Sequence, residues 1–217
     1  MDKKYAIFDM DGTLIDSMGF WKNLGREYLA KNGITDDVEE VLGKIKPMTM
    51  TESAQLFCDE FHLKKTAESI AREMNDAMDT HYREDIPLKK GAEKYLKHLF
   101  DSGVKMCVAS ATDLKLMEVC LSRLGVAKYF EFLLSCEEVG AGKNHPDVYF
   151  EAARRLESRP EDIAVYEDAS YAIKTAVEAG FYTIAVHDSS NHNQWEELKT
   201  MTKEAIYDYE NSIGNRR

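Results

Sequence analysis

The sequence has 217 residues, of which 44% are hydrophobic and 31% charged, and its formal net charge is −11. This length fits one domain, or one core with a modest insert, and the composition excludes collagen-like and largely disordered chains. The acidic excess argues against a nucleic acid polymer as partner, because a polyanion would be repelled. A small phosphorylated molecule is still allowed, since a local metal ion and one or two lysines can override the overall charge.

Membrane attachment and secretion are not expected. No apolar stretch approaches the roughly 18 residues that a spanning helix needs, and the run from Tyr5 to Phe8 is too short for a signal peptide. None of the four cysteines forms a C-x-x-C pair, and Cys107 lies inside an apolar run, where a buried thiol is expected. We therefore predict a cytoplasmic protein, as a monomer or a weak homodimer.

Short apolar runs alternate with helical patterns over most of the chain. Five runs predict buried strands, at Tyr5 to Phe8, Val104 to Ala109, Phe132 to Leu134, Ile163 to Tyr166 and Tyr182 to Val186. Their nearly continuous apolar character is typical of a parallel sheet covered on both faces. Helical spacing is seen over residues 91–100, 113–124, 146–156 and 170–179. The alternation predicts an α/β fold with a Rossmann-like, doubly wound parallel sheet.

Two segments depart from this alternation. About 95 residues separate the first two predicted strands, far more than one crossover helix needs. This stretch shows helical patterns only, around Leu24 to Leu29 and at residues 37–42, 51–61 and 66–82. We predict an inserted helical domain, or cap, at residues 16–88, and a core at residues 1–15 and 89–217. At the carboxyl end we expect a short helix at Trp195 to Met201, a short strand at Ala205 to Tyr207 and a disordered tail from Asn211 to Arg217.

Chemically active side chains follow the predicted strands. In a parallel sheet the carboxyl ends of the strands share one edge, where ligands bind, so these residues are expected to lie together. They are Asp9, Asp11, Gly12 and Thr13 after the first strand, Ser110, Ala111 and Thr112 after the second, Lys143 after the third, and Glu167 and Asp168 after the fourth. Clustered carboxylates need a cation, and an all-oxygen ligand set favours Mg²⁺.

These motifs resemble those of the haloacid dehalogenase superfamily. The first is Asp9-Met10-Asp11-Gly12-Thr13-Leu14, the second ends in Ser110, the third contains Lys143 and the fourth is Glu167-Asp168. The inserted helices stand where the first cap type of that superfamily stands, and the whole is similar to the subgroup of β-phosphoglucomutase and phosphoglycolate phosphatase. The third motif differs, since Asn144 and His145 precede Pro146.

The resemblance implies roles for the core residues. Asp9 is expected to be the nucleophile that forms an aspartyl-phosphate, and Asp11 the general acid and base. Mg²⁺ would be bound by Asp9, the backbone carbonyl of Asp11, Asp168 and, directly or through water, Glu167. The phosphate would be bound by Ser110, Lys143 and the backbone of Ala111.

The expected function is a Mg²⁺-dependent phosphatase for small phosphorylated metabolites such as sugar phosphates. Asp11 indicates a phosphatase or a phosphomutase, because dehalogenases lack an aspartate at that position. A sugar-phosphate phosphomutase stays open as the alternative, although the mutases carry histidine where Trp21 stands. A protein that binds the metal or metabolite without catalysis is a third possibility. In the cap, Trp21, Lys44 and Lys46 are candidate substrate contacts.

Overall fold

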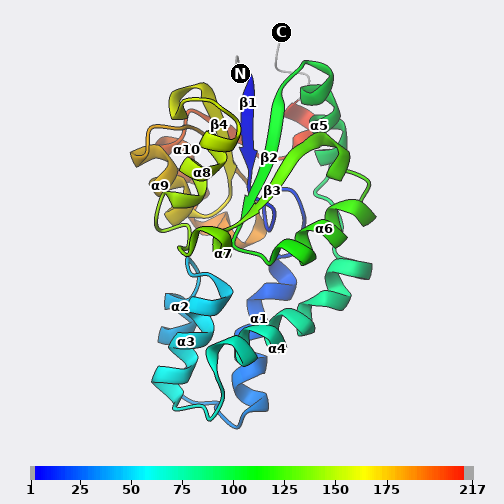
Figure 1. Cartoon of the computed structure of the whole chain (residues 1–217). Coiled ribbons are helices and arrows are strands. Elements are labelled where there is room, and N and C mark those ends of the chain that lie inside the picture. The colour runs from blue at the N-terminus through cyan, green and yellow to red at the C-terminus, as the bar shows by residue number, and fades with distance from the viewer. Residues whose placement is uncertain (1–2, 213–217) are drawn as a thin grey trace.

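A computed structural model describes residues 3–212. Its centre is a six-stranded parallel sheet in the order β3-β2-β1-β4-β5-β6, which confirms the predicted fold class (Figure 1). The first strand lies between the second and the fourth, so the doubly wound order reverses at β1. The strands are β1 (Tyr5–Phe8), β2 (Lys105–Ser110), β3 (Phe130–Ser135), β4 (Ile163–Glu167), β5 (Tyr182–Val186) and β6 (Glu204–Ile206).

Both faces of the sheet are buried, which explains why the strands are almost continuously apolar. In β1, Ala6 and Phe8 join one apolar cluster, whereas Ile7 between them joins the other. The ring of Phe8 stacks on that of Tyr166 in β4, with centroids 4.0 Å apart. Alternate side chains of one strand therefore supply two separate cores.

Helices cover both faces. Helices α5 (Ala92–Asp101) and α6 (Leu114–Arg123) pack against the cluster that contains Phe8, and α8 (Asp147–Arg155) packs against the cluster that contains Ile7. The remaining helices around the sheet are α7 (Cys136–Val139), α9 (Ser170–Glu178), α10 (Trp195–Met201), α11 (Tyr209–Ser212) and the short 3₁₀ turns at Ala127–Tyr129, Pro160–Asp162 and Ser189–Gln194.

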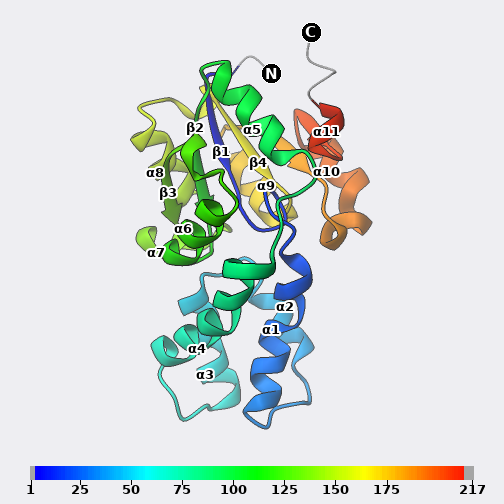
Figure 2. The same ribbon diagram turned by 90° about the vertical axis from the view of Figure 1, so that its right-hand side faces the viewer.

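Helices α1 to α4 form a separate bundle beside one end of the sheet (Figures 1 and 2). The chain passes between the sheet and this bundle twice, and we call these two connecting segments the crossings. They lie side by side, because the amide of Asp16 donates to the carbonyl of Pro87 at 3.0 Å and the amide of Lys89 donates to the carbonyl of Leu14 at 2.9 Å. The helices are α1 (Met18–Lys31), α2 (Glu39–Lys44), α3 (Met50–Phe61) and α4 (Ala67–Thr80).

Two helices of this bundle differ from expectation. The short helix predicted to stop before Gly43 runs through that glycine to Lys44, where nothing crowds the position. The helix predicted to end at Tyr82 changes at Thr80 into a π-helical turn, His81–Asp85. An apolar pattern of helical period does not distinguish an α-helix from a single π turn, so the sequence carried no signal for this change.

The carboxyl end is more ordered than predicted. Asn211 and Ser212 belong to α11, so the expectation of disorder is wrong for these two residues; positions 213–217 lie outside the described residues. Helix α11 is held by Tyr209, which is buried and whose hydroxyl donates to the carbonyl of Thr13 at 3.1 Å. None of the helices within residues 3–212 is long and apolar enough to cross a membrane.

Candidate active site

The central strands bring the predicted residues to one edge of the sheet. Phe8 is in register with Val108 of β2 and Tyr166 of β4. Asp9 follows Phe8 directly, and its amide donates to the carbonyl of Tyr166 at 3.0 Å. The next residue of β4 is Glu167, and Asp168 follows it. The switch point of the strand order therefore gathers carboxylates from two neighbouring strand ends.

Three of these carboxylates form a compact buried group. Asp9, Glu167 and Asp168 each offer an oxygen, and the three oxygens lie within 4.8 Å of one another. All three residues are at most 6% exposed. A buried, all-oxygen donor set of this kind suits a hard divalent cation and not a soft one. The side chain of Asp11 lies outside the group and is engaged elsewhere.

Lys143 provides the positive charge within the group. Its ammonium bonds Oδ1 of Asp9 and lies 2.6 Å from Oε1 of Glu167, and Tyr149 donates to the same Glu167 oxygen at 2.8 Å. Burial disfavours the charged amine, but the carboxylates of Asp9 and Glu167 hold the pKa of Lys143 well above its ordinary value. Although Asn144 and His145 separate it from Pro146, Lys143 reaches the strand ends.

Burial also perturbs the carboxyl groups. It raises the pKa of Asp9 to about 7, a shift that Lys143 opposes and that the charges of Glu167 and Asp11 reinforce. Burial and the neighbouring Asp9 and Glu167 raise the pKa of Asp168 well above its ordinary value. The site holds more negative charge than its one lysine compensates, which is the electrostatic setting in which a cation binds.

Asp168 is fixed through both its side chain and its backbone. Thr13 donates to its Oδ1 at 3.2 Å, and Asn191 donates to its carbonyl at 2.9 Å. Gly12 has a φ of +79°, and a Cβ there would lie 2.5 Å from Oδ2 of Asp168. A glycine is needed at this turn for two reasons, the left-handed backbone and the close approach of the carboxylate.

Asp11 is bound by donors from three parts of the chain. Tyr82 donates to Oδ1 at 2.6 Å, Trp21 donates to the same oxygen at 3.1 Å, and Thr112 donates to Oδ2 at 2.6 Å. Trp21 comes from α1 and Tyr82 from the π-helical turn, so the inserted segment contacts Asp11 directly. Trp21, a predicted substrate contact, is thus placed beside Asp11.

The second strand ends beside these groups. Ser110 is buried, and its hydroxyl accepts from the amide of Thr112 at 3.2 Å. Ser135 donates to the carbonyl of Thr112 at 2.9 Å and so ties the loop to β3. Ala111 is half-buried in the same loop. The structure brings Ser110 and Ala111 to the same edge of the sheet as Asp9.

The two candidate lysines of the inserted segment are not gathered with these groups. Lys44 is exposed and pairs with Glu40 on its own helix at 2.7 Å. The side chain of Lys46 is exposed as well. Its backbone, however, approaches the core, because the hydroxyl of Tyr171 donates to the carbonyl of Lys46 at 2.7 Å.

The inserted helices touch the core at two further points. The amide of Thr51 donates to Oε1 of Glu137 at 2.9 Å. Gly142, next to Lys143, lies so close to the carbonyl of Pro47 that a Cβ would collide with it. The loop that carries Lys143 is therefore packed under the segment that begins α3.

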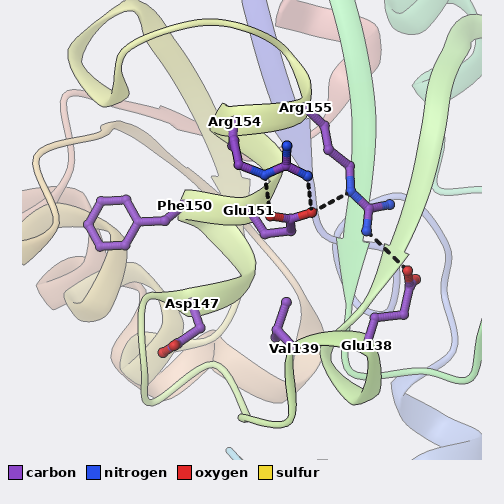
Figure 3. A pocket seen from close by; sticks show the side chains of 7 residues that line it. All are labelled: Glu138, Val139, Asp147, Phe150, Glu151, Arg154 and Arg155. Atoms are coloured by element: carbon purple, nitrogen blue, oxygen red, sulfur yellow. Dashed lines mark hydrogen bonds and ion pairs between the residues drawn. The ribbon is translucent and has the colours of Figure 1, made fainter.

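A separate pocket of about 550 Å³ lies on the surface between α7 and α8 (Figure 3). Its arginines are already paired, since Arg154 and Arg155 both bond Glu151 and Arg155 also bonds Glu138. None of the strand-end residues lines it. The lining residues are Glu138, Val139, Asp147, Phe150, Glu151, Arg154 and Arg155.

Several contacts of the site were not predicted from the sequence. Thr112 stood among the strand-end residues without a role, and Tyr149 was noted only as part of the third motif. Tyr82 and Asn191 were given no role at the site. The signal for Tyr149 was its position in that motif, six residues after Lys143 and in the first turn of α8. Tyr82 and Asn191 reach the site only through tertiary structure, far in sequence from the residues they contact.

Comparisons with known proteins agree with this geometry. A sequence model described as haloacid dehalogenase-like hydrolase matches residues 6–186. The chain belongs to this family. The resemblance predicted from the four motifs is thereby confirmed.

Individual relatives differ in how much of their length is matched. The chain is 31% identical over 182 residues to a bifunctional riboflavin kinase/FMN phosphatase of Arabidopsis thaliana; the match covers 83% of this chain but only 48% of that protein. It is 26% identical to the fructose-1-phosphate phosphatase YqaB of Escherichia coli, over 86% of this chain and 98% of that one. The crystal structure of CbbY from Rhodobacter sphaeroides in complex with phosphate has a TM-score of 0.80 at 21% identity, covering 96% and 95% of the two chains, and shows the shared fold.

Proposed function

We propose that the protein is a Mg²⁺-dependent phosphatase that hydrolyses small phosphorylated metabolites, sugar phosphates among them, through an aspartyl-phosphate. The observation that carries this proposal is the buried group of Asp9, Glu167 and Asp168 with Lys143 bound to the first two. Membership of a hydrolase family supports it, as do the activities of the similar FMN and fructose-1-phosphate phosphatases.

In the first half-reaction, a carboxylate oxygen of Asp9 attacks phosphorus. A new bond forms between Asp9 and phosphorus while the bond from phosphorus to the ester oxygen breaks. Asp11 gives its proton to that departing oxygen, so the alcohol leaves neutral. Lys143, the hydroxyl of Ser110 and the backbone amide of Ala111 would bind the phosphoryl oxygens, on which charge accumulates in the transition state.

In the second half-reaction, water attacks the phosphorus of the aspartyl-phosphate. Asp11 takes a proton from the water, the bond between phosphorus and Asp9 breaks, and inorganic phosphate leaves. Both aspartates then return to their starting roles. Asp9 stands at the centre of the sheet edge, next to the carboxylates and the lysine, a position that suits a nucleophile shared by both half-reactions.

The residues present fit Mg²⁺. Asp9, Glu167 and Asp168 would hold it, together with the backbone carbonyl of Asp11, and the bound ion would neutralise negative charge on the phosphoryl group. We assign residues 1–15 and 89–217 to the catalytic core and residues 16–88 to a cap over it. The paired crossings at Asp16 and Pro87 support this division.

Substrate selection is assigned to the cap. Trp21 is one of the cap side chains that contact Asp11, and Lys44 and Lys46 come just before the residues that pack against the Lys143 loop. The cytoplasmic location, and the monomeric or weakly dimeric state, stay predictions.

The proposal is tested by phosphate release from a panel of sugar phosphates, nucleotides, phosphoglycolate and an aryl phosphate, with Mg²⁺ and with EDTA. Metal-dependent release supports the phosphatase, and the preferred substrate defines what the cap selects. If nothing is released, the same assay with a sugar bisphosphate added tests the phosphomutase. A protein inactive in both assays that still binds Mg²⁺ overturns the catalytic proposal.

A further inference from the structure

Tyr82 is the buried side chain that contacts Asp11 from the inserted segment at the shortest distance. It is 0% exposed, and its hydroxyl lies 2.6 Å from Oδ1 of Asp11. Burial, together with the charge of Asp11, raises the pKa of Tyr82 well above its ordinary value. The phenol is the donor in this contact, because a carboxylate oxygen accepts.

The two carboxylate oxygens of Asp11 accept hydrogen bonds from different donors. The indole N–H of Trp21 is shared between the Tyr82 hydroxyl at 2.8 Å and Oδ1 of Asp11 at 3.1 Å. Both aromatic donors thus point at Oδ1. Oδ2 receives the single hydroxyl of Thr112 at 2.6 Å, so it is the oxygen with accepting capacity left for a proton.

The backbone of Tyr82 is anchored to the core and not only to the inserted helices. Arg123, on α6, donates through Nε to the carbonyl of Tyr82 at 2.9 Å and through Nη2 to the carbonyl of Ile86. These carbonyls lie in and just after the π-helical turn, His81–Asp85. A π turn is a frequent feature of functional sites because it displaces a side chain from the α-helical path. The turn and Arg123 together place the Tyr82 hydroxyl against Asp11.

We propose that Tyr82 is a positioning residue that holds Asp11 with Oδ2 directed to the reacting oxygens. In this arrangement Oδ2 gives its proton to the departing alcohol and later takes one from water, while Oδ1 stays bound to Tyr82 and Trp21. Tyr82 itself exchanges no proton with the substrate. The inference rests on the proposed phosphatase activity, and specifically on Asp11 as its acid and base.

The test uses Tyr82→Phe, which removes one hydroxyl and leaves the ring. We compare kcat/KM for the best alkyl phosphate of the panel with that for p-nitrophenyl phosphate. An alkoxide leaving group needs a proton from Asp11, whereas nitrophenolate leaves without one, and kcat/KM reports the steps up to that departure. If Tyr82 positions the acid, kcat/KM for the alkyl phosphate falls by roughly 10- to 100-fold and that for the aryl phosphate changes little.

Tyr95→Phe is the matched control, because it also removes a buried hydroxyl, one that lies 3.0 Å from the hydroxyl of Tyr166. It should leave the ratio of the two kcat/KM values unchanged. Trp21→Phe, which removes the second donor to Oδ1, should shift the ratio in the same direction as Tyr82→Phe and provides the answer if Tyr82→Phe fails to fold.

The outcomes distinguish a failure of the proposed phosphatase function from a failure of the positioning role of Tyr82. If the wild-type protein hydrolyses neither substrate, the proposed function fails. If the wild type is active and Tyr82→Phe (or Trp21→Phe, where Tyr82→Phe does not fold) loses the same factor of kcat/KM on both substrates, the positioning role of Tyr82 is overturned. The same holds if the variant loses no activity. In both cases the phosphatase proposal stands.

Discussion

The ammonium of Lys143 lies 2.6 Å from Oε1 of Glu167 and bonds Asp9 as well, so one cation serves two buried carboxylates. Asp168 adds a third acidic group within 4.8 Å. The metal-free site is consequently over-supplied with negative charge. This imbalance determines how the protein should respond to a metal ion, to pH and to substitution of the charged residues.

Asp168→Asn should stabilise the metal-free protein while it weakens metal binding. The amide keeps an acceptor for Thr13 and removes one buried charge. In EDTA we expect its Tm to rise by a few degrees, since about 1 kcal/mol corresponds to roughly 2–4 °C in a chain of this size. Mg²⁺ should raise the Tm of the wild type and have little effect on the variant. A variant with lower Tm in EDTA and an unchanged response to Mg²⁺ would contradict this account.

The stability of the metal-free protein should fall as pH rises from about 4 to 7. The pKa of Asp9 is raised to about 7 in the folded protein, so the folded state binds more protons than the unfolded state in this window. Stability therefore decreases with rising pH there. Urea unfolding in EDTA should show a smaller decline for Asp9→Asn than for the wild type, by roughly 1–3 kcal/mol. An identical decline in both proteins would mean that Asp9 does not titrate in this range.

Lys143→Met should be strongly destabilising and inactive. It leaves Asp9 and Glu167 buried without their shared cation, a change that costs about 3–5 kcal/mol when a buried pair loses one member. Lys143→Arg keeps the charge and is the control; it should retain most of the stability. The check is the free energy of unfolding in EDTA, and equal losses in the two variants would show that shape rather than charge is decisive.

Gly12→Ala should disturb the metal site through Asp168. The added Cβ would lie 2.5 Å from Oδ2 of Asp168, at a residue with φ of +79°. We expect weaker Mg²⁺ binding by calorimetry and a loss of roughly 1–3 kcal/mol in stability. Gly19→Ala is the control, because nothing lies within 4 Å of that position in α1. Unchanged Mg²⁺ affinity in Gly12→Ala would show that a Cβ at this position does not displace the carboxylate of Asp168.

The sequence predicted best the site residues that stand at the ends of the strands. The apolar runs located the strands because each is buried on both faces, and parallel strands necessarily bring the carboxyl ends of β1, β2 and β4 to one edge. The gathering of Asp9, Ser110 and Glu167 was therefore predictable from topology alone. Lys143 could be included because the loop after β3 opens on the same edge.

Contacts made through the inserted helices were less predictable. Tyr82 was expected at the end of an α-helix, and its π-helical turn has no counterpart in apolar periodicity. Asn191 reaches Asp168 from a loop 23 residues away in sequence. Lys44, a candidate substrate contact, pairs with Glu40 one helical turn away, and its contact with substrate stays a prediction.

The central claim is that Asp9 is the nucleophile of a metal-dependent phosphatase. The most direct measurement compares phosphate release by the wild type and by Asp9→Asn on the best substrate of the panel, with Mg²⁺ and with EDTA. Circular dichroism shows whether both are folded. We predict Mg²⁺-dependent release by the wild type alone, with the same circular dichroism spectrum for both proteins. Appreciable release by a folded Asp9→Asn protein would contradict the claim.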